Sequence, residues 1–171
     1  MTVERLSGQS WAQAFTSFRS SAFRWEAQGV YREPAEQGPM SDFLAGRKPD
    51  MSFMDGYLAR VKQQTVGSLR YSRVRVLTEP LNDYLRFQLS FTHLNVEAGE
   101  DIRLLPEVRR CELGLPMEDF WLFDDEWAAR MHFGDEGFTH ADVVTDDTTL
   151  NRFREIRDLA WREAIPFADY G

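Results

Sequence analysis

The sequence predicts a single α/β domain spanning residues 1–171, in which helices flank a mixed β-sheet. Two observations predict this class. A strand–helix–strand pattern over residues 72–106 is the unit that builds parallel sheets, and two strand-like runs around residues 124–126 predict an antiparallel hairpin. With 171 residues, 43% of them hydrophobic, the chain is long and apolar enough for one sizeable core.

The first part of the chain predicts helices around an extended segment. Apolar residues follow Ser10 at spacings of three and four, so we expect Ser10 to cap a first helix. Residues 23–33 read as extended, and Arg32 to Met40, with two prolines and a glycine, reads as a loop. A short helix at 41–45 and a longer helix over 52–67 complete this part.

The middle of the chain decides the fold class. Arginines alternate with valines over residues 73–77, which indicates a strand with one apolar face. Leucines and phenylalanines then alternate as in a strand, but the polar residues gather in one arc of a helical wheel, about 100° wide. We therefore predict a buried helix over 81–98 that leads to a parallel strand at 102–105. Pro80 would lie in its first turn, and Gly99 would end it.

A hairpin is expected around three consecutive acids. The predicted strands at 120–123 and 127–133 flank Asp124, Asp125 and Glu126, which suit a turn. Such a cluster could hold a hard cation. Successive strand residues point to opposite sides, however, so three acids in a row rarely converge on one ion. We interpret them as solvated turn residues.

Two elements are expected beyond the hairpin. The first is a strand at 141–144. The second is an amphipathic helix that Asp147 or Thr148 caps and Pro166 stops.

Composition excludes several classes of protein. The net charge of −8 argues against direct binding of nucleic acid. No apolar run is long enough to span a membrane, and the first residues lack the profile of a signal peptide, so we expect a cytoplasmic protein. Cys111 is the only cysteine, which excludes an internal disulfide.

No familiar catalytic motif is present, and we expect no catalytic residues, cofactor or metal. A serine elbow, a Walker loop and a dinucleotide fingerprint are all absent from the sequence. His132 and His140 are eight residues apart without a metal-binding spacing, so a shared metal is not expected.

Arginines form the strongest candidate site. Arg73 and Arg75 lie on one face of a predicted strand, and Arg103 opens the strand after the helix. Their guanidinium groups could bind a carboxylate or phosphate. Glu79 lies at the carboxyl end of a strand, where open α/β sheets bind ligands, and Arg86 projects from the polar arc of the helix. The alternative is that these arginines only form salt bridges with the many acidic residues.

Several segments carry a resemblance to a known family. "RVRVLTEP", "NDYLRF", "NVEAGEDIRLLP", "DFWLFDD" and "RDLAWREAIP" resemble an actinobacterial family of unknown function, over most of the chain from about Phe23 onward. Its members are often encoded beside XRE-type helix-turn-helix regulators. The resemblance implies a cytoplasmic protein in a regulatory neighbourhood.

The order of the elements is also similar to that of phospholipase D-like domains attached to bacterial transcription factors. Catalytic members carry His and Lys two residues apart. Here His93 is followed at that spacing by Asn95, and His132 by Gly134. The resemblance therefore implies a non-catalytic version that binds a ligand or a partner.

Three functional hypotheses follow. The first is a non-catalytic regulatory or ligand-sensing module that acts on DNA only through a helix-turn-helix regulator. The second is an enzyme that uses the arginines with Glu79, Glu100 or Asp119, and the third is a component of a toxin–antitoxin-like pair. The expected partners are the regulator, an anionic small molecule and a second copy of the chain in a homodimer, with no membrane.

Overall fold

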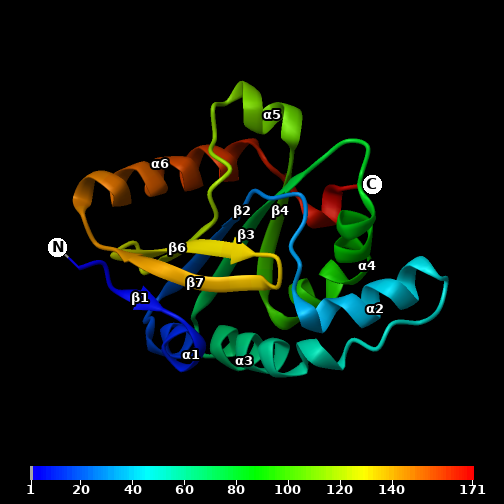
Figure 1. Cartoon of the computed structure of the whole chain (residues 1–171). Helices are drawn as coiled ribbons and strands as arrows, with labels where there is room; N and C mark the ends of the chain where they lie inside the picture. The colour runs from blue at the N-terminus through cyan, green and yellow to red at the C-terminus, as the bar shows by residue number, and fades with distance from the viewer. Residues whose placement is uncertain (1) are drawn as a thin grey trace.

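The computed structural model describes residues 2–171 as one mixed sheet with helices on both faces (Figure 1). The sheet has eight strands in the order β1-β7-β6-β5-β2-β3-β4-β8. Strands β2, β3 and β4 are parallel, and every other neighbouring pair is antiparallel. The strands are β1 (Arg5–Leu6), β2 (Ser21–Glu26), β3 (Arg70–Leu77), β4 (Glu100–Pro106), β5 (Phe120–Phe123), β6 (Trp127–Gly134), β7 (Gly137–Val144) and β8 (Ile165–Pro166).

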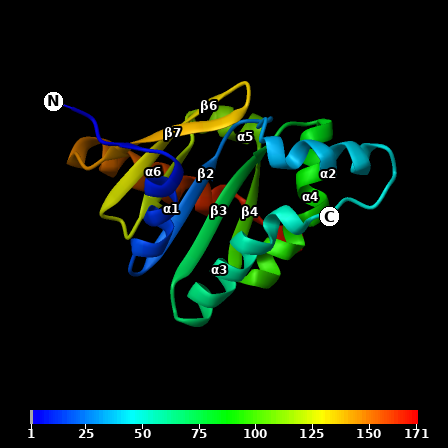
Figure 2. The same cartoon turned by 60° about the horizontal axis from the view of Figure 1, so that its bottom comes forward.

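Helices pack against the sheet. The helices are α1 (Gly8–Ser17), α2 (Pro34–Leu44), α3 (Asp55–Val66), α4 (Asp83–Ala98), α5 (Glu107–Glu112) and α6 (Asp147–Glu163), with 3-10 turns at Ser52–Met54 and Phe167–Asp169. Figure 2 shows α1 and α3 on the same side of β2, β3 and β4. Within residues 2–171, no helix is both long and apolar enough to cross a bilayer.

The core consists of two main layers. Tyr71 and Trp121 pack with α1 and α3 on what we call the α3 face of the sheet. Val74 and Phe120 pack with α6 on the opposite face, which we call the α6 face, and the ring of Phe120 stacks on Phe153 at 3.9 Å. The strands are therefore covered on both sides, as parallel sheets require.

The predicted strand–helix–strand unit is confirmed. Strands β3 and β4 are parallel neighbours, and α4 connects them. The helix begins at Asp83, a little later than predicted, because the side chain of Asn82 accepts a hydrogen bond from the Leu85 N–H at 2.7 Å and so forms the N-cap. Pro80 lies before this cap, and Gly99 ends the helix with a φ of 120°.

The prediction was wrong in part for the first segment. Ser7, not Ser10, is the N-cap of α1, and Ser10 completes its capping box. The expected loop from Arg32 to Met40 is largely helix α2. Its first residue, Pro34, has the φ that helices need and loses no hydrogen bond there.

The hairpin is confirmed, and its neighbours are longer or shifted. Strands β5 and β6 flank a turn at residues 124–126, and β7 begins before the predicted strand at 141–144. Helix α6 is capped by Asp146, whose carboxylate accepts from the Thr149 N–H at 2.8 Å. Pro166 lies just beyond this helix and pairs with Arg103 as part of β8.

Candidate functional site

A cleft of about 490 Å³ lies on the α3 face, between the sheet and helices α1 to α4. Arg24 and Glu26 of β2 pair in register with Arg73 and Arg75 of β3. Side chains alternate along a strand, so all four point to the same face, and together they form the floor of the cleft. The β6–β7 hairpin and α2 contribute to its walls.

Glu26 is the centre of a buried ion network. Its carboxylate accepts hydrogen bonds from Arg75 Nε and Arg73 Nη1, both at 2.7 Å, and lies 3.9 Å from Arg24 Nε. Burial alone would raise the pKa of Glu26, but Arg75, Arg73 and Arg24 lower it to about 2. Glu26 therefore stays ionised and compensates the buried guanidinium groups.

Asp119 connects the network to the loop after β2. It is fully buried and accepts hydrogen bonds from Arg24 Nη2 and the Ala27 N–H, both at 2.9 Å, and from the Tyr31 hydroxyl. Burial raises the pKa of Asp119 even though Arg24 lowers it. These contacts position Tyr31 at the cleft.

Glu100 holds the opposite end of the network. It accepts a hydrogen bond from Arg73 Nη2 at 3.1 Å and another from the Tyr57 hydroxyl. Burial and the charge of Glu100 raise the pKa of Tyr57 well above its ordinary value. Tyr57 therefore remains a neutral hydrogen-bonding group.

Aromatic rings lie beside the guanidinium groups of the cleft. The guanidinium carbon of Arg24 lies 5.9 Å from the ring centroid of Trp121, and that of Arg73 lies 5.7 Å from the same ring. Arg60 of α3 lies 5.1 Å from the ring centroid of Phe15. Cations near ring faces are stabilised by the ring quadrupole, and the same rings give the cleft flat apolar surfaces.

Among the described residues, three arginine N–H groups of the cleft and the side-chain amide of Gln88 have no hydrogen-bond acceptor. The buried Nε atoms of Arg24, Arg60 and Arg73 lack a partner among the described residues. A buried donor without an acceptor is destabilising, by roughly 1–3 kcal/mol. Arg60 also forms no salt bridge within residues 2–171. The cleft can therefore satisfy acceptor atoms of a ligand.

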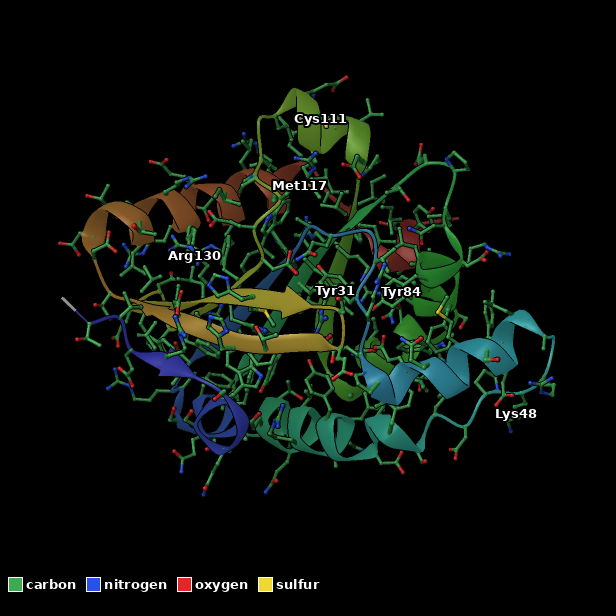
Figure 3. All side chains as sticks on the ribbon, viewed as in Figure 1. Tyr31, Lys48, Tyr84, Cys111, Met117 and Arg130 are labelled. Carbon is green, nitrogen blue, oxygen red and sulfur yellow. The ribbon has the colours of Figure 1, made fainter. Side chains whose placement is uncertain are left out.

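The side of the cleft near α2 is acidic. Burial raises the pKa of Glu36, which accepts a hydrogen bond from the Tyr84 hydroxyl at 3.1 Å. Glu33 accepts the Phe138 N–H at 2.9 Å and so contacts the hairpin. Figure 3 labels Tyr31 and Tyr84, whose ring centroids are 6.0 Å apart. A ligand here would meet carboxyl and hydroxyl groups.

The structure separates the arginines that the sequence grouped together. Arg73 and Arg75 lie in the cleft. Arg103 pairs in register with Val74 and therefore points to the α6 face. Its guanidinium lies 4.1 Å from the ring centroid of Trp161, and Nη1 donates to the Trp161 carbonyl at 2.9 Å. Arg103 thus anchors α6 and does not reach the cleft.

Two further candidates lie at the surface. Arg86 is exposed and pairs with Asp83 on the same helix, and Glu79 is exposed in the loop before it.

Arg24 and Glu26 were not identified as site residues from the sequence. The signal was present in "FRWE", where charged and aromatic residues alternate as they do in β3.

The three acids of the hairpin turn each have a protein partner. Asp124 accepts hydrogen bonds from the backbone of the loop before β2. Asp125 forms an ion pair with Arg157, and Glu126 pairs with Arg19 at 2.9 Å. The turn prediction is confirmed, but Asp124 is a structural anchor and not only a solvated residue.

Two of the histidines come together, contrary to expectation. His132 on β6 lies directly opposite His140 on β7. Asp142 completes a cluster in which one potential ligand atom from each residue lies within 4.8 Å of the others. Sequence spacing did not suggest this cluster, because it depends on the register of two strands.

Comparison with known proteins gives a family without an assigned activity. No curated protein matches the sequence. The model of a domain of unknown function, DUF6879, matches residues 9–171, and the chain therefore belongs to this family.

Proposed function

We propose that this protein is a non-catalytic regulatory module that binds a small molecule in the cleft on the α3 face. The unpartnered Nε groups of Arg24, Arg60 and Arg73, which lie beside aromatic rings, carry this proposal. Apolar pockets with a few convergent polar groups are the usual sites for small ligands. A cleft of about 490 Å³ is within the range of such sites.

The charges of the cleft favour a planar ligand with one anionic group. The buried carboxylates of Glu26, Asp119 and Glu100 pair with the arginines of the cleft floor. None of them pairs with Arg60, so the positive charge of Arg60 has no carboxylate partner among the described residues. A carboxylate or phosphate near Arg60 would accept its free N–H and that of Arg73. A flat ring would lie against Trp121, and polar substituents could reach Glu36 and Tyr84.

The regulatory role and the partner come from the resemblance in sequence. A family encoded beside XRE-type helix-turn-helix regulators supports such a regulator as the partner, in the cytoplasm. The net charge of −8 supports action on DNA through the partner only. A mixed sheet with helices on both faces is compatible with a phospholipase D-like fold that lacks the catalytic His–Lys pair.

An enzyme is the second candidate, and one observation favours it. Glu36 is a carboxyl group with a raised pKa in a cleft that also holds guanidinium groups. Such carboxyl groups are candidate general acids or bases. A bound compound that is recovered unchanged supports the module, whereas turnover supports the enzyme.

Thermal shift with defined probes tests the binding proposal. The probes are benzoate and adenosine monophosphate, with acetate as an anion without a ring and indole as a ring without a charge. We expect a ring-bearing anion to raise the melting temperature of the wild type more than either control compound. Arg60→Gln should abolish this shift and Arg86→Gln, at an exposed site, should keep it. Equal shifts in the two variants, or no shift with any probe, would contradict the proposal.

A further inference from the structure

His132, His140 and Asp142 form a compact cluster on the α6 face of the β6–β7 hairpin. His132 and His140 are a directly opposed cross-strand pair, and Asp142 lies two residues after His140 on the same face. The side chains are 40%, 26% and 20% exposed, respectively, so the cluster is partly shielded yet open on one side. The cleft described above lies on the opposite face.

The distances in the cluster match the spacing of metal ligands. His132 Nε2 lies 2.9 Å from Asp142 Oδ2, and His140 Nε2 lies 3.9 Å from Asp142 Oδ1. Two ligands of a tetrahedral zinc ion, each about 2.0–2.1 Å from the metal, are roughly 3.3 Å apart. The observed separations bracket this value. The two imidazole rings are stacked with centroids 4.5 Å apart, so their side chains must rotate for both lone pairs to point at one ion.

The contacts of the Thr139 hydroxyl favour one tautomer of His140. This hydroxyl can donate its single hydrogen to the His132 carbonyl oxygen at 3.1 Å. It also lies 3.0 Å from His140 Nδ1, and both contacts are hydrogen bonds only if Nδ1 carries the proton and donates it to the hydroxyl oxygen. The lone pair of His140 is then on Nε2, which faces Asp142. An outer hydrogen bond of this kind is typical of metal-binding histidines.

Asp142 supplies an available anionic oxygen. Its Oδ1 atom is buried and has no hydrogen-bond donor among the described residues. The nearest charged group besides the histidines is Arg5 of β1, whose Nε lies 3.4 Å from this oxygen. The Oδ1 atom can therefore accept a bond from an ion without giving up a hydrogen bond within the protein.

We propose that His132, His140 and Asp142 bind a divalent first-row transition-metal ion, of which Zn²⁺ is the simplest example. Two imidazoles and one carboxylate suit such ions, whereas Ca²⁺ and Mg²⁺ prefer sites made only of oxygen ligands. Three protein ligands leave at least one coordination position open for water or another molecule. Nε2 of His132 faces Asp142 Oδ2. To bind the ion through Nε2, the imidazole must carry its single hydrogen on Nδ1, so binding shifts the tautomer of His132 and releases no proton from a neutral ring.

Metal titration of the full chain tests the site directly. The experiment uses Cys111→Ser as background, because Cys111 is an exposed free thiol that could bind zinc by itself. Zn²⁺ affinity is measured by competition with a chromophoric chelator, and Co²⁺ binding by its visible absorption. We expect one ion per chain, with Co²⁺ bands of low coordination number. Excess Mg²⁺ should not compete.

Variants then assign the ligands. His132→Ala, His140→Ala and Asp142→Asn should each lose the Co²⁺ absorption and most of the Zn²⁺ affinity. The matched control is His93→Gln, which removes an exposed histidine on α4 and should leave binding unchanged. Circular dichroism confirms that each variant is folded. If the background chain binds no Zn²⁺, or if His93→Gln weakens binding as much as His140→Ala, the proposal is overturned.

A conservative pair tests the tautomer argument without removing a ligand. Thr139→Val removes the acceptor for His140 Nδ1, so Zn²⁺ affinity should fall about 10- to 100-fold. Thr139→Ser keeps a hydroxyl and should retain most of the affinity. Thr139 is exposed, so neither change should disturb folding. Equal affinities for the valine and serine variants would show that Thr139 does not orient His140 and would remove the support that the tautomer gives to this site.

Discussion

Asp124 acts as an anchor between two segments that are distant in sequence. Its carboxylate accepts the backbone N–H groups of Arg19, Ser20 and Ser21 and the Ser20 hydroxyl, at 2.7 to 3.1 Å. These hydrogen bonds lower the pKa of Asp124 despite its partial burial. The β5–β6 turn is thereby joined to the loop that precedes β2.

We expect Asp124→Ala to destabilise the protein clearly more than Asp125→Ala. Both residues have a positive φ, 56° and 59°, so the backbone strain of an alanine is the same in each. Urea unfolding should give a free energy of unfolding about 1–2 kcal/mol lower for Asp124→Ala than for Asp125→Ala. This difference measures the stability that the hydrogen bonds of Asp124 contribute. Equal losses would show that these hydrogen bonds contribute no net stability.

Glu26 should make folding sensitive to acid. Its pKa is about 2 in the folded protein, below the usual 4.5. A depressed pKa contributes stability that is present above pH 4.5 and is lost as the pH falls toward 2. The contribution is on the order of 3 kcal/mol. Asp119 and Glu36 have raised pKa values and act with the opposite sign, so only a comparison with a variant isolates Glu26.

Glu26→Gln provides that comparison. The variant should be less stable by about 3–5 kcal/mol at pH 7, because it leaves buried guanidinium groups without their shared carboxylate. It should also lose the part of the acid sensitivity that belongs to Glu26. Urea unfolding at several pH values between 3 and 7 measures both effects. Parallel curves for wild type and variant would place the acid sensitivity in other groups.

At the scale of the elements, the end of α4 lies close to α3 at Gly99. A Cβ atom at this position would lie 2.3 Å from Thr65 Oγ1 of α3, and φ is 120°. That hydroxyl also lies 3.1 Å from the Ala98 carbonyl oxygen, to which it can donate. The end of α4 is therefore fixed by contact with α3 as well as by its own backbone.

Gly99→Ala should cost more than Gly114→Ala. Gly114 also has a positive φ, 66°, but a Cβ there would meet nothing within 4 Å, so it reports backbone strain alone. We expect about 1 kcal/mol for Gly114→Ala and a further loss of roughly 1–3 kcal/mol for Gly99→Ala because of overpacking. Similar melting temperatures for the two variants would mean that α3 moves to accommodate the added methyl group with no loss of stability.

The sequence predicted those elements whose side chains repeat with a clear helical or strand period. The polar arc of α4, the alternation in β3 and the turn residues of the hairpin each reflect the periodicity of one element. The C-terminal end of α2 coincides with the helix predicted at 41–45. Its first part, residues 34–40, was missed because prolines favour a loop on average, whereas here Met40 and Phe43 pack against α4. Tertiary packing overrides local propensity in such segments.

The candidate site was predictable only in part, because it depends on register. Arg73 and Arg75 share a face by strand alternation, which the sequence shows. The face of Arg103 depends on its pairing with Val74, and a shift of one residue would reverse it. The same limit applies to His132 and His140, which only the pairing of β6 with β7 places opposite each other.

At the scale of the whole molecule, one sheet separates the two proposed sites. The cleft faces α1 and α3, and the histidine cluster lies on the α6 face. The sites share strand β6, where Met131 and Phe133 line the cleft and His132 between them points to the other side. Strand β6 is therefore a direct connection between the two sites.

We expect the two sites to bind independently. A packed sheet covered on both faces is rigid, and effects at separate sites without shared partners usually add within about 0.5 kcal/mol. His140→Ala should therefore abolish the thermal shift caused by Zn²⁺ and leave the shift caused by a ring-bearing anion intact, while Arg60→Gln should do the reverse. The shift with both compounds together should equal the sum of the separate shifts. If Zn²⁺ instead changes the affinity for the anion, the hairpin moves as a unit, and the metal site would then regulate the cleft through β6.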